Sequence, residues 1–184
     1  MKNIKIISKT YKYKPILNQV LDNYDDFDFI SKTEEHSNYG GSTNPPGFLP
    51  LCMGVQDKTK STIKDSELLV KTKLYDKYTM VHKFWYDWGF RQHARAAFFR
   101  LKPGGIVGSH IDDGTYYLQK DRYHFSLQGI YRYKVGNEEF IVEPGTFFWF
   151  NNKLYHEAEN IGDVDRITLV FDSPHSKHNP HHKV

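Results

Sequence analysis

The sequence predicts a mainly β fold of the sandwich or jelly-roll type, preceded by α-helices that pack on the sheet. Short runs rich in aromatic and β-branched residues follow one another from about residue 94 to residue 172, separated by turns that contain Gly or Pro. Before residue 94, the apolar residues recur mostly at helical spacing. The predicted strands are Ala94 to Leu101, Arg122 to Tyr133, Glu139 to Val142, Thr146 to Phe150 and Arg166 to Asp172.

The length of 184 residues fits one domain, residues 1–184, better than two. Residues 1–93 are predicted to be a helical support that also carries a substrate loop. Residues 94–173 are predicted to be the jelly-roll core. Residues 174–184 form a polar, His-rich tail that we expect to be loosely ordered.

The first elements follow from local patterns. Residues 3–8 predict a short strand, and Pro15 opens a helix that places Ile16 and Val20 on one face. A polar stretch with several Gly and Pro residues then runs from about residue 31 to residue 64. Such a segment is typical either of a lid or binding loop or of a poorly ordered excursion, and both remain open.

A second helix is predicted after this stretch, with Asp65-Ser66 as its N-terminal cap. We expect it to end before Gly89, because glycine disfavours the helix interior. Its core-facing residues share helical spacing, and they are Val70, Leu74, Tyr78, Val81 and Trp85.

Composition excludes several classes of function. The formal net charge is only +3 and no basic stripe is present, so we do not expect a nucleic-acid partner. No apolar run is long enough to span a membrane, and residues 1–5 lack the apolar stretch of a signal peptide. Cys52 is the only cysteine, which rules out an intrachain disulfide. A cytoplasmic protein without a membrane partner is the expectation.

A metal site is the most specific prediction. His110 and Asp112 are two residues apart and would share one face of an extended segment. His156 would come from a strand that is distant in sequence and close in space. Two imidazoles and one carboxylate hold Fe(II) on one face of an octahedron and leave the other positions open. Zinc accepts the same ligands, and a His-x-Asp pair alone is a weak signal.

The other histidines are weaker candidates. His36, His82 and His93 have no partners at metal-ligand spacing, and we expect them to be structural or exposed. Four further histidines lie in the tail and could bind divalent metals only adventitiously. These are His175, His178, His181 and His182.

Two strands carry one polar face and one apolar face. In the first strand, the polar face holds Arg122, His124, Ser126 and Gln128, whereas Tyr123, Phe125 and Leu127 lie on the other. In the last strand, Arg166 and Thr168 oppose Ile167, Leu169 and Phe171. A jelly roll with a ligand cavity would turn these polar faces inward, although an ordinary half-exposed strand would turn them to water.

An inward arginine needs an anion. A buried guanidinium is costly unless it is paired, and it binds a carboxylate through two parallel hydrogen bonds. A dicarboxylate that chelates the metal at one end would present its far carboxylate to Arg122 or Arg166. The alternative is a surface arginine on an edge strand.

Residues from about Ala94 to Asp172 resemble the aspartyl/asparaginyl β-hydroxylase branch of the 2-oxoglutarate- and Fe(II)-dependent oxygenases. The resemblance covers a little under half of the chain, with its motifs in the same order as in the family. These motifs are Arg100-Leu101-Lys102-Pro103-Gly104-Gly105, His110-Ile111-Asp112, Arg122-Tyr123-His124-Phe125-Ser126-Leu127, Glu143-Pro144-Gly145-Thr146-Phe147, His156-Glu157 and Asp165-Arg166.

The resemblance implies a double-stranded β-helix, the cupin-like jelly roll, and a hydroxylase that uses O2. It implies that His110, Asp112 and His156 bind iron. Arg166 would hold the C5 carboxylate of 2-oxoglutarate, with Thr168 beside it. The cosubstrate would also be faced by Arg122 and His124.

The resemblance also bounds the substrate. Relatives act on Asp or Asn side chains, in proteins or as free or carrier-bound amino acids. We therefore expect an amino-acid, peptide or protein substrate. The first ~90 residues match nothing in the family and are expected to set substrate choice, and a serine that helps hold the cosubstrate in relatives has no clear counterpart.

Other functions fit the same fold. The chain could be a cupin-type metal-binding isomerase or a non-catalytic binding protein, and a virion or structural β domain is a weaker alternative. Arg122 and Arg166 discriminate between these possibilities, because a plain cupin needs neither of them aimed at the metal.

Overall fold

The computed structural model describes residues 2–28, 47–90 and 94–174. The His-rich tail from His175 onward, His36 and His93 lie outside these residues. So do residues 31–46, the first part of the Gly- and Pro-containing stretch for which a lid and a poorly ordered excursion were both left open. In the described part of the chain, no helix is long and apolar enough to cross a membrane.

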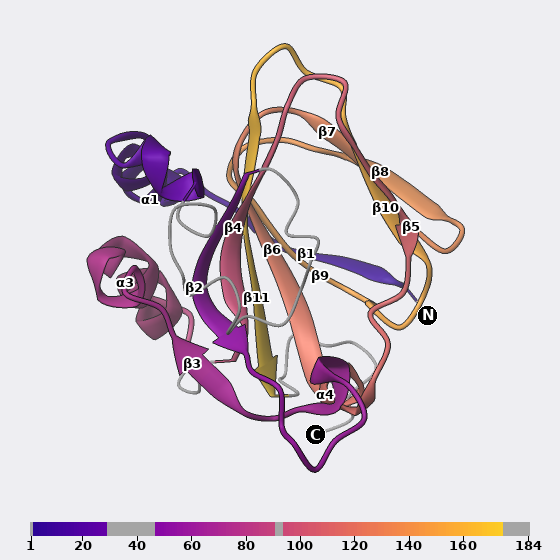
Figure 1. Cartoon of the computed structure of the whole chain (residues 1–184). Helices are drawn as coiled ribbons and strands as arrows, with labels where there is room; N and C mark the ends of the chain where they lie inside the picture. The colour runs from indigo at the N-terminus through magenta and orange to yellow at the C-terminus, as the bar shows by residue number, and fades with distance from the viewer. Residues whose placement is uncertain (1, 29–46, 91–93, 175–184) are drawn as a thin grey trace.

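The predicted jelly roll is confirmed. From β4 onward the strands alternate between two antiparallel sheets, except at the β7–β8 hairpin, whose two strands lie in the same sheet (Figure 1). Their order is β9-β6-β11-β4 within the larger sheet and β5-β10-β7-β8 in the smaller one. This alternation defines a double-stranded β-helix. The strands are β4 (Ala96–Leu101), β5 (Ile106–His110), β6 (Lys120–Gln128), β7 (Tyr131–Val135), β8 (Glu138–Val142), β9 (Thr146–Phe150), β10 (His156–Asn160) and β11 (Arg166–Pro174).

Three N-terminal strands extend the larger sheet, which contains seven strands within the described ranges. The predicted strand at residues 3–8 is confirmed as β1 (Ile4–Lys9), which pairs with β9. On the opposite side, β2 (Phe48–Gly54) pairs with β4, and β3 (Leu69–Lys71) pairs with β2.

Strand β2 corrects one prediction, because it lies inside the stretch that was expected to be irregular. Its residues are apolar and largely buried, and a register shift follows Pro50 where β2 pairs with β4. Proline cannot donate to a sheet and is usually confined to edges and bulges. The bulge accommodates it here, so the local Pro and Gly signals were misleading.

Two helices cover the outer face of the larger sheet. They are α1 (Tyr13–Leu21) and α3 (Thr79–Asp87), which lie on the side away from the smaller sheet (Figure 1). Short helical turns complete the chain: η1 (Tyr24–Asp28), η3 (Ile63–Asp65), η4 (Tyr75–Lys77) and α4 (Thr115–Leu118).

The second helix begins later than predicted. Residues 69–71 form β3 and residues 75–77 a short turn, so the helix starts at Thr79 and not after Asp65-Ser66. Val70 pairs with Met53 across β2 and β3, and this strand pairing overrides the helical spacing. The predicted end before Gly89 is confirmed, because α3 stops at Asp87.

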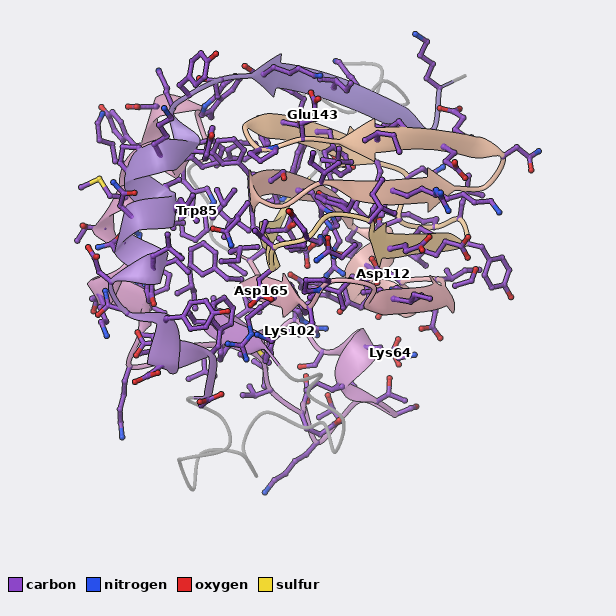
Figure 2. All side chains as sticks on the ribbon, turned by 90° about the horizontal axis from the view of Figure 1, so that it is seen from above. Lys64, Trp85, Lys102, Asp112, Glu143 and Asp165 are labelled. Carbon is purple, nitrogen blue, oxygen red and sulfur yellow. The ribbon has the colours of Figure 1, made fainter. Side chains whose placement is uncertain are left out.

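The main hydrophobic core lies between the helices and the larger sheet. Ile16 and Val20 from α1, with Phe84 and Trp85 from α3, pack against the apolar face of β6 and β11. Trp85 lies in this layer in Figure 2, far from the labelled Asp112. The predicted apolar faces are confirmed, since Tyr123, Phe125, Leu127, Ile167, Leu169 and Phe171 all belong to this core. The polar faces of β6 and β11 therefore turn toward the smaller sheet.

Candidate metal centre

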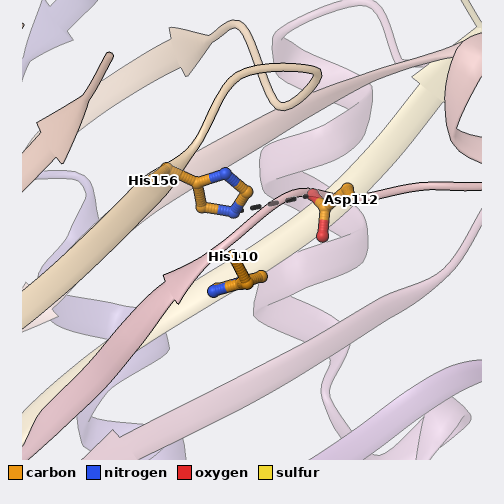
Figure 3. A group of neighbouring side chains, drawn as sticks. All are labelled: His110, Asp112 and His156. Carbon is orange, nitrogen blue, oxygen red and sulfur yellow. Dashed lines mark ion pairs between the residues drawn. The ribbon is translucent and has the colours of Figure 1, made fainter. Parts of the chain in front are cut away.

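Three side chains from two distant parts of the chain meet at one point. His110 ends β5, Asp112 follows it, and His156 begins β10. Strands β5 and β10 are antiparallel neighbours that place His110 opposite His156. One ligand atom from each residue lies within 4.8 Å of those of the other two (Figure 3). The structure thus brings together the three predicted ligands.

The position of Asp112 has a cause that its spacing does not reveal. Strand β5 ends at His110, so Asp112 is not held by a shared strand. The backbone N–H of Asp112 donates to the carbonyl oxygen of Asn152 at 3.1 Å. The Asn152 side chain in turn donates to Oδ2 of Asp112 at 3.2 Å. The loop after β9 therefore orients this carboxylate.

Both imidazoles are oriented by the backbone. Nδ1 of His110 lies 2.7 Å from the carbonyl oxygen of Gly108, and Nδ1 of His156 lies 2.9 Å from that of Leu154. A carbonyl oxygen only accepts, so each Nδ1 carries a proton, and in the neutral form of each ring Nε2 keeps the free lone pair. Hydrogen bonds of this kind fix the tautomer of histidines that bind metals.

The protonation state of His156 suits a ligand. Burial is the main cause that lowers its pKa, although the carboxylate of Asp112, with Oδ2 3.9 Å from Nε2, opposes this shift (Figure 3). A lowered pKa keeps the imidazole neutral near neutral pH, and the neutral form is the one that binds a metal.

The donor set fits a ferrous ion. Two neutral imidazole nitrogens and one carboxylate oxygen form the facial set that leaves open positions for other ligands. Zinc accepts the same donors, so the three residues alone do not select the metal.

Arg122 lies between two carboxylates. Its Nε and Nη2 donate to the two oxygens of Asp172 at 2.7 and 2.9 Å, and its Nη1 lies 3.0 Å from Oδ2 of Asp112. Burial lowers the pKa of Arg122, but the two carboxylates outweigh burial and hold the pKa well above its ordinary value. The guanidinium is therefore bound to a candidate metal ligand as well as facing the interior.

A cavity of about 100 Å³ opens beside the three ligands. Its wall includes two of them, His110 and His156, and three other basic residues, Arg122, His124 and Arg166. The rest of the wall is mostly apolar, with Phe99, Val107, Tyr133, Ala158 and Val170. The three residues predicted to face the cosubstrate, Arg122, His124 and Arg166, thus share one cavity with the group His110, Asp112 and His156, here called the metal cluster. Thr168 lies beside Arg166.

Arg166 is the unusual charge in this cavity. It is only 3% exposed, its Nε donates to Oγ1 of Thr168 at 3.0 Å, and its guanidinium lies 4.2 Å from the ring centroid of Tyr131. No acidic side chain pairs with it among the residues that the structure describes. A buried cation without an anion is unfavourable, so the site is suited to an anionic ligand.

His124 is neutral in its surroundings. Burial, followed by the positive charges of Arg166 and Arg122, lowers its pKa well below the ordinary value. Aromatic rings enclose it, with ring centroids of Tyr133 and Phe150 at 5.1 and 4.9 Å. Within the described ranges its Nδ1 has no hydrogen-bond partner. It therefore contributes an uncharged polar group to the cavity.

Sequence reasoning missed three residues of this site. Asn152 and Asp172 orient Asp112 and Arg122, and Tyr131 packs on the guanidinium of Arg166. Ser126, which the alternation had placed on the polar face of its strand without a role, is buried, pairs in register with Thr168, and has no hydrogen-bond partner in the described part of the chain. The alternation of β11 could also have indicated Asp172, whereas nothing local indicates Asn152.

His82 lies apart from this cluster, with Nε2 2.8 Å from the carbonyl oxygen of Tyr75, as expected for a structural histidine.

Comparisons with known proteins identify one family. A family model described as aspartyl/asparaginyl β-hydroxylase matches residues 76–176. No curated protein matches the chain.

Solved structures with cupin-type names also match. The cupin domain of Cnp3 from Schizosaccharomyces pombe is 15% identical, over 47% of this chain and 61% of that chain, with a TM-score of 0.40. A Klebsiella pneumoniae protein with a double-stranded β-helix domain is 17% identical, over 49% of this chain and 72% of that chain, with a TM-score of 0.38. A predicted oxalate decarboxylase from Thermotoga maritima is 14% identical, over 67% of this chain and 79% of that chain, with a TM-score of 0.40. At these values, the similarities carry no inference about function.

Proposed function

Since the chain belongs to the aspartyl/asparaginyl β-hydroxylase family, we propose that it is a 2-oxoglutarate- and Fe(II)-dependent dioxygenase that hydroxylates an amino-acid side chain. The family model covers β4 to β11, the part of the chain that carries every residue of the metal cluster. The family alone supports a hydroxylase with a substrate of the amino-acid or protein kind, whereas the choice of metal and cosubstrate rests on the cavity.

One observation carries the proposal: Arg166 is buried, lacks an acidic partner among the described residues, and lines the same cavity as His110 and His156. A keto diacid would satisfy both ends of this cavity. Its keto acid end can chelate the metal, and its distal carboxylate can bind the guanidinium of Arg166. An isomerase or a simple metal-binding protein has no need for this second charge.

The metal would be held by Nε2 of His110, Nε2 of His156 and the carboxylate of Asp112. When bound, Fe(II) and 2-oxoglutarate supply the oxidation: O2 is consumed, the keto acid loses CO2 to become succinate, and a substrate C–H bond becomes C–OH. The protein supplies position and a shielded site. The backbone carbonyls of Gly108 and Leu154 keep the two imidazoles in the required tautomer.

Arg166 is the main anchor of the cosubstrate in this proposal. Thr168 fixes the guanidinium by accepting from Nε, and Tyr131 supports it from its ring face. Both contacts leave Nη1 and Nη2 of Arg166 available for a carboxylate, which binds two donors at once. The hydroxyl of Ser126, buried near Thr168, can serve the role of the serine that the sequence did not reveal.

Arg122 and His124 have supporting roles. Arg122 lines the cavity and is bound to Asp112, so it both faces the cosubstrate and orients a metal ligand. His124 is kept neutral by its surroundings and offers a polar ring to the cosubstrate without adding charge.

Succinate formation tests the proposal. The full chain is incubated aerobically with Fe(II), ascorbate and 2-oxoglutarate, with and without Asp- or Asn-containing peptides and free amino acids. We expect slow succinate release that a suitable substrate accelerates, and its loss in His110→Ala and Asp112→Ala. Exposed Tyr155→Ala, near His156 in sequence, is the matched control. Absence of succinate from a folded, iron-loaded protein under all of these conditions contradicts the proposal.

A further inference from the structure

A second cavity of about 210 Å³ adjoins the first. Phe99, Arg122 and Val170 line both of them, so these side chains lie between the two cavities. The remaining wall comes mainly from β2 and β4, with Ile63 and Tyr117 at its margin. A molecule that occupied the second cavity would therefore lie next to the metal centre.

Arg95 lines this cavity, and neutral groups hold it in place. Its Nη1 donates to the hydroxyl of Tyr117 at 3.0 Å, and its Nη2 donates to the carbonyl oxygens of Ile63 and Ser66 at 2.6 and 3.1 Å. The guanidinium also lies 3.9 Å from the ring centroid of Tyr116. All of these partners are uncharged, so they orient the guanidinium and leave its charge uncompensated.

The backbone makes room for this side chain. A Cβ placed on Gly54 would lie 2.6 Å from the guanidinium carbon of Arg95, much closer than real contacts allow. Glycine at this position of β2 thus permits the close approach of Arg95.

No negative charge balances Arg95 within the described residues. No acidic side chain there forms an ion pair with it, unlike Arg122, which has two. The nearby thiol of Cys52 is no substitute, because burial raises its pKa to about 11 and keeps it protonated. A half-buried guanidinium at the wall of an apolar cavity favours an anionic ligand.

We propose that the second cavity is the substrate subsite and that it takes a small carboxylate with an apolar body, whose carboxylate binds at Arg95. This assignment rests on the proposed function for the reaction, but the carboxylate site itself can be tested alone. The hydroxyl of Tyr117 and the guanidinium of Arg95 form the polar end of the subsite. The apolar walls, formed by Phe48, Met53, Ile63, Ala97, Phe99 and Val170, surround the body of the substrate.

This arrangement also sets the orientation of the substrate. Its charged end lies at Arg95, so its apolar body extends toward Phe99 and Val170, which border the metal cavity. The C–H bond that reacts would then lie on the apolar body and away from the carboxylate. A free, hydrophobic amino acid or a related small acid fits this description.

Two probes of nearly identical shape test the subsite. Binding of isocaproate and of its uncharged amide, isocaproamide, to the full-length, metal-free chain is measured by saturation-transfer NMR titration. We expect isocaproate to bind at least about tenfold more tightly, because a charge-assisted hydrogen bond is lost in the amide. Equal binding of the two probes overturns the proposal.

Variants then locate the binding site. Arg95→Met should reduce isocaproate binding about tenfold or more, whereas Lys60→Met, which removes an exposed positive charge nearby, should leave it unchanged. Arg166→Met should reduce it much less than Arg95→Met does, because Arg166 lines only the first cavity. Loss in Arg166→Met with retention in Arg95→Met would assign the probe to the first cavity and overturn the proposal.

A second variant guards against misfolding of Arg95→Met. Gly54→Ala keeps the charge but forces the guanidinium to move, and it should also weaken isocaproate binding. If folded Gly54→Ala and folded Arg95→Met both bind isocaproate with wild-type affinity, the proposed subsite is wrong, even if succinate is still formed. Conversely, isocaproate binding without any succinate formation contradicts the proposed reaction and leaves the carboxylate subsite standing.

Discussion

Asp172 accepts two hydrogen bonds from Arg122, and the two residues face each other in register across β11 and β6. The third donor group of Arg122 reaches Oδ2 of Asp112. A fully buried acid on the last strand therefore orients, through one arginine, a carboxylate of the metal cluster. Hydrogen-bonded partners behind metal ligands usually change metal affinity when they are removed.

Asp172→Asn should weaken metal binding about tenfold. Without the charge of Asp172, the guanidinium of Arg122 acts on Asp112 alone and withdraws negative charge from the ligand. Co(II) titration followed by visible absorption measures the affinity and the ligand field together. Asp163→Asn, at an exposed position, is the matched control. A folded Asp172→Asn protein with unchanged Co(II) affinity and spectrum would remove this role.

Arg166→Met should raise the 2-oxoglutarate KM by about tenfold to a hundredfold, with a smaller change in kcat. Arg166→Lys should not restore the wild-type value, because ammonium lacks the planar pair of donors that a carboxylate binds. Thr168→Val should have a weaker effect in the same direction, since it removes only the acceptor for Nε. The control is Arg132→Met, whose side chain is 47% exposed on the smaller sheet. An unchanged KM in Arg166→Met would contradict the assignment.

The metal-free protein should lose stability as the pH falls below about 6.5. The folded-state pKa of His124 lies well below this ordinary value of 6.5, mainly because of burial. The unfolded chain therefore binds a proton that the folded chain does not. The resulting stability is complete above the unfolded pKa and falls by roughly 1.4 kcal/mol per pH unit below it, until the folded pKa is reached.

Urea unfolding at about pH 7.5 and pH 5.5 measures this slope. His124→Gln should reduce the difference between the two pH values, whereas His82→Gln, on α3 and outside the cavity, should preserve it. The same slope in His124→Gln and in the wild type would show that other groups cause the pH dependence.

Phe84→Ala should destabilise the protein by about 3–5 kcal/mol. Phe84 is 4% exposed and stacks on Phe125 at a centroid distance of 4.6 Å, so its removal opens a cavity between α3 and the larger sheet. Tyr86→Ala, on the same helix but 69% exposed, should cost far less. Chemical denaturation of the metal-free protein compares the two, and equal losses would contradict the assignment of this core.

The strand faces were predictable from sequence because the signal is local. In β6 and β11, alternate residues must face opposite sides, so the pattern around His124 and Arg166 already separates a cavity face from a core face. The same logic predicted that His110 and Asp112 lie close together, although the strand ends at His110 and Asp112 lies in the segment that follows. These predictions needed no knowledge of which strands pair.

The remaining features depend on contacts between distant residues. Val70 has helical spacing to Leu74, yet its pairing with Met53 makes it part of a strand. Asn152 reaches Asp112 from another loop, and the partnership of Asp172 with Arg122 requires the register of β11 against β6. Local sequence carries no information about these distances, so the residues that orient the site were missed, although the three residues that converge there were predicted.

The central claim is that one keto diacid joins the metal cluster to Arg166. Anaerobic addition of 2-oxoglutarate to the Fe(II)-loaded chain tests it most directly, with the visible metal-to-ligand charge-transfer band as the signal. We predict a band that saturates with 2-oxoglutarate, that disappears in His110→Ala, and that needs at least about tenfold more 2-oxoglutarate in Arg166→Met. No band from a folded protein that binds Fe(II), or a band with the same 2-oxoglutarate dependence in Arg166→Met, would contradict the account.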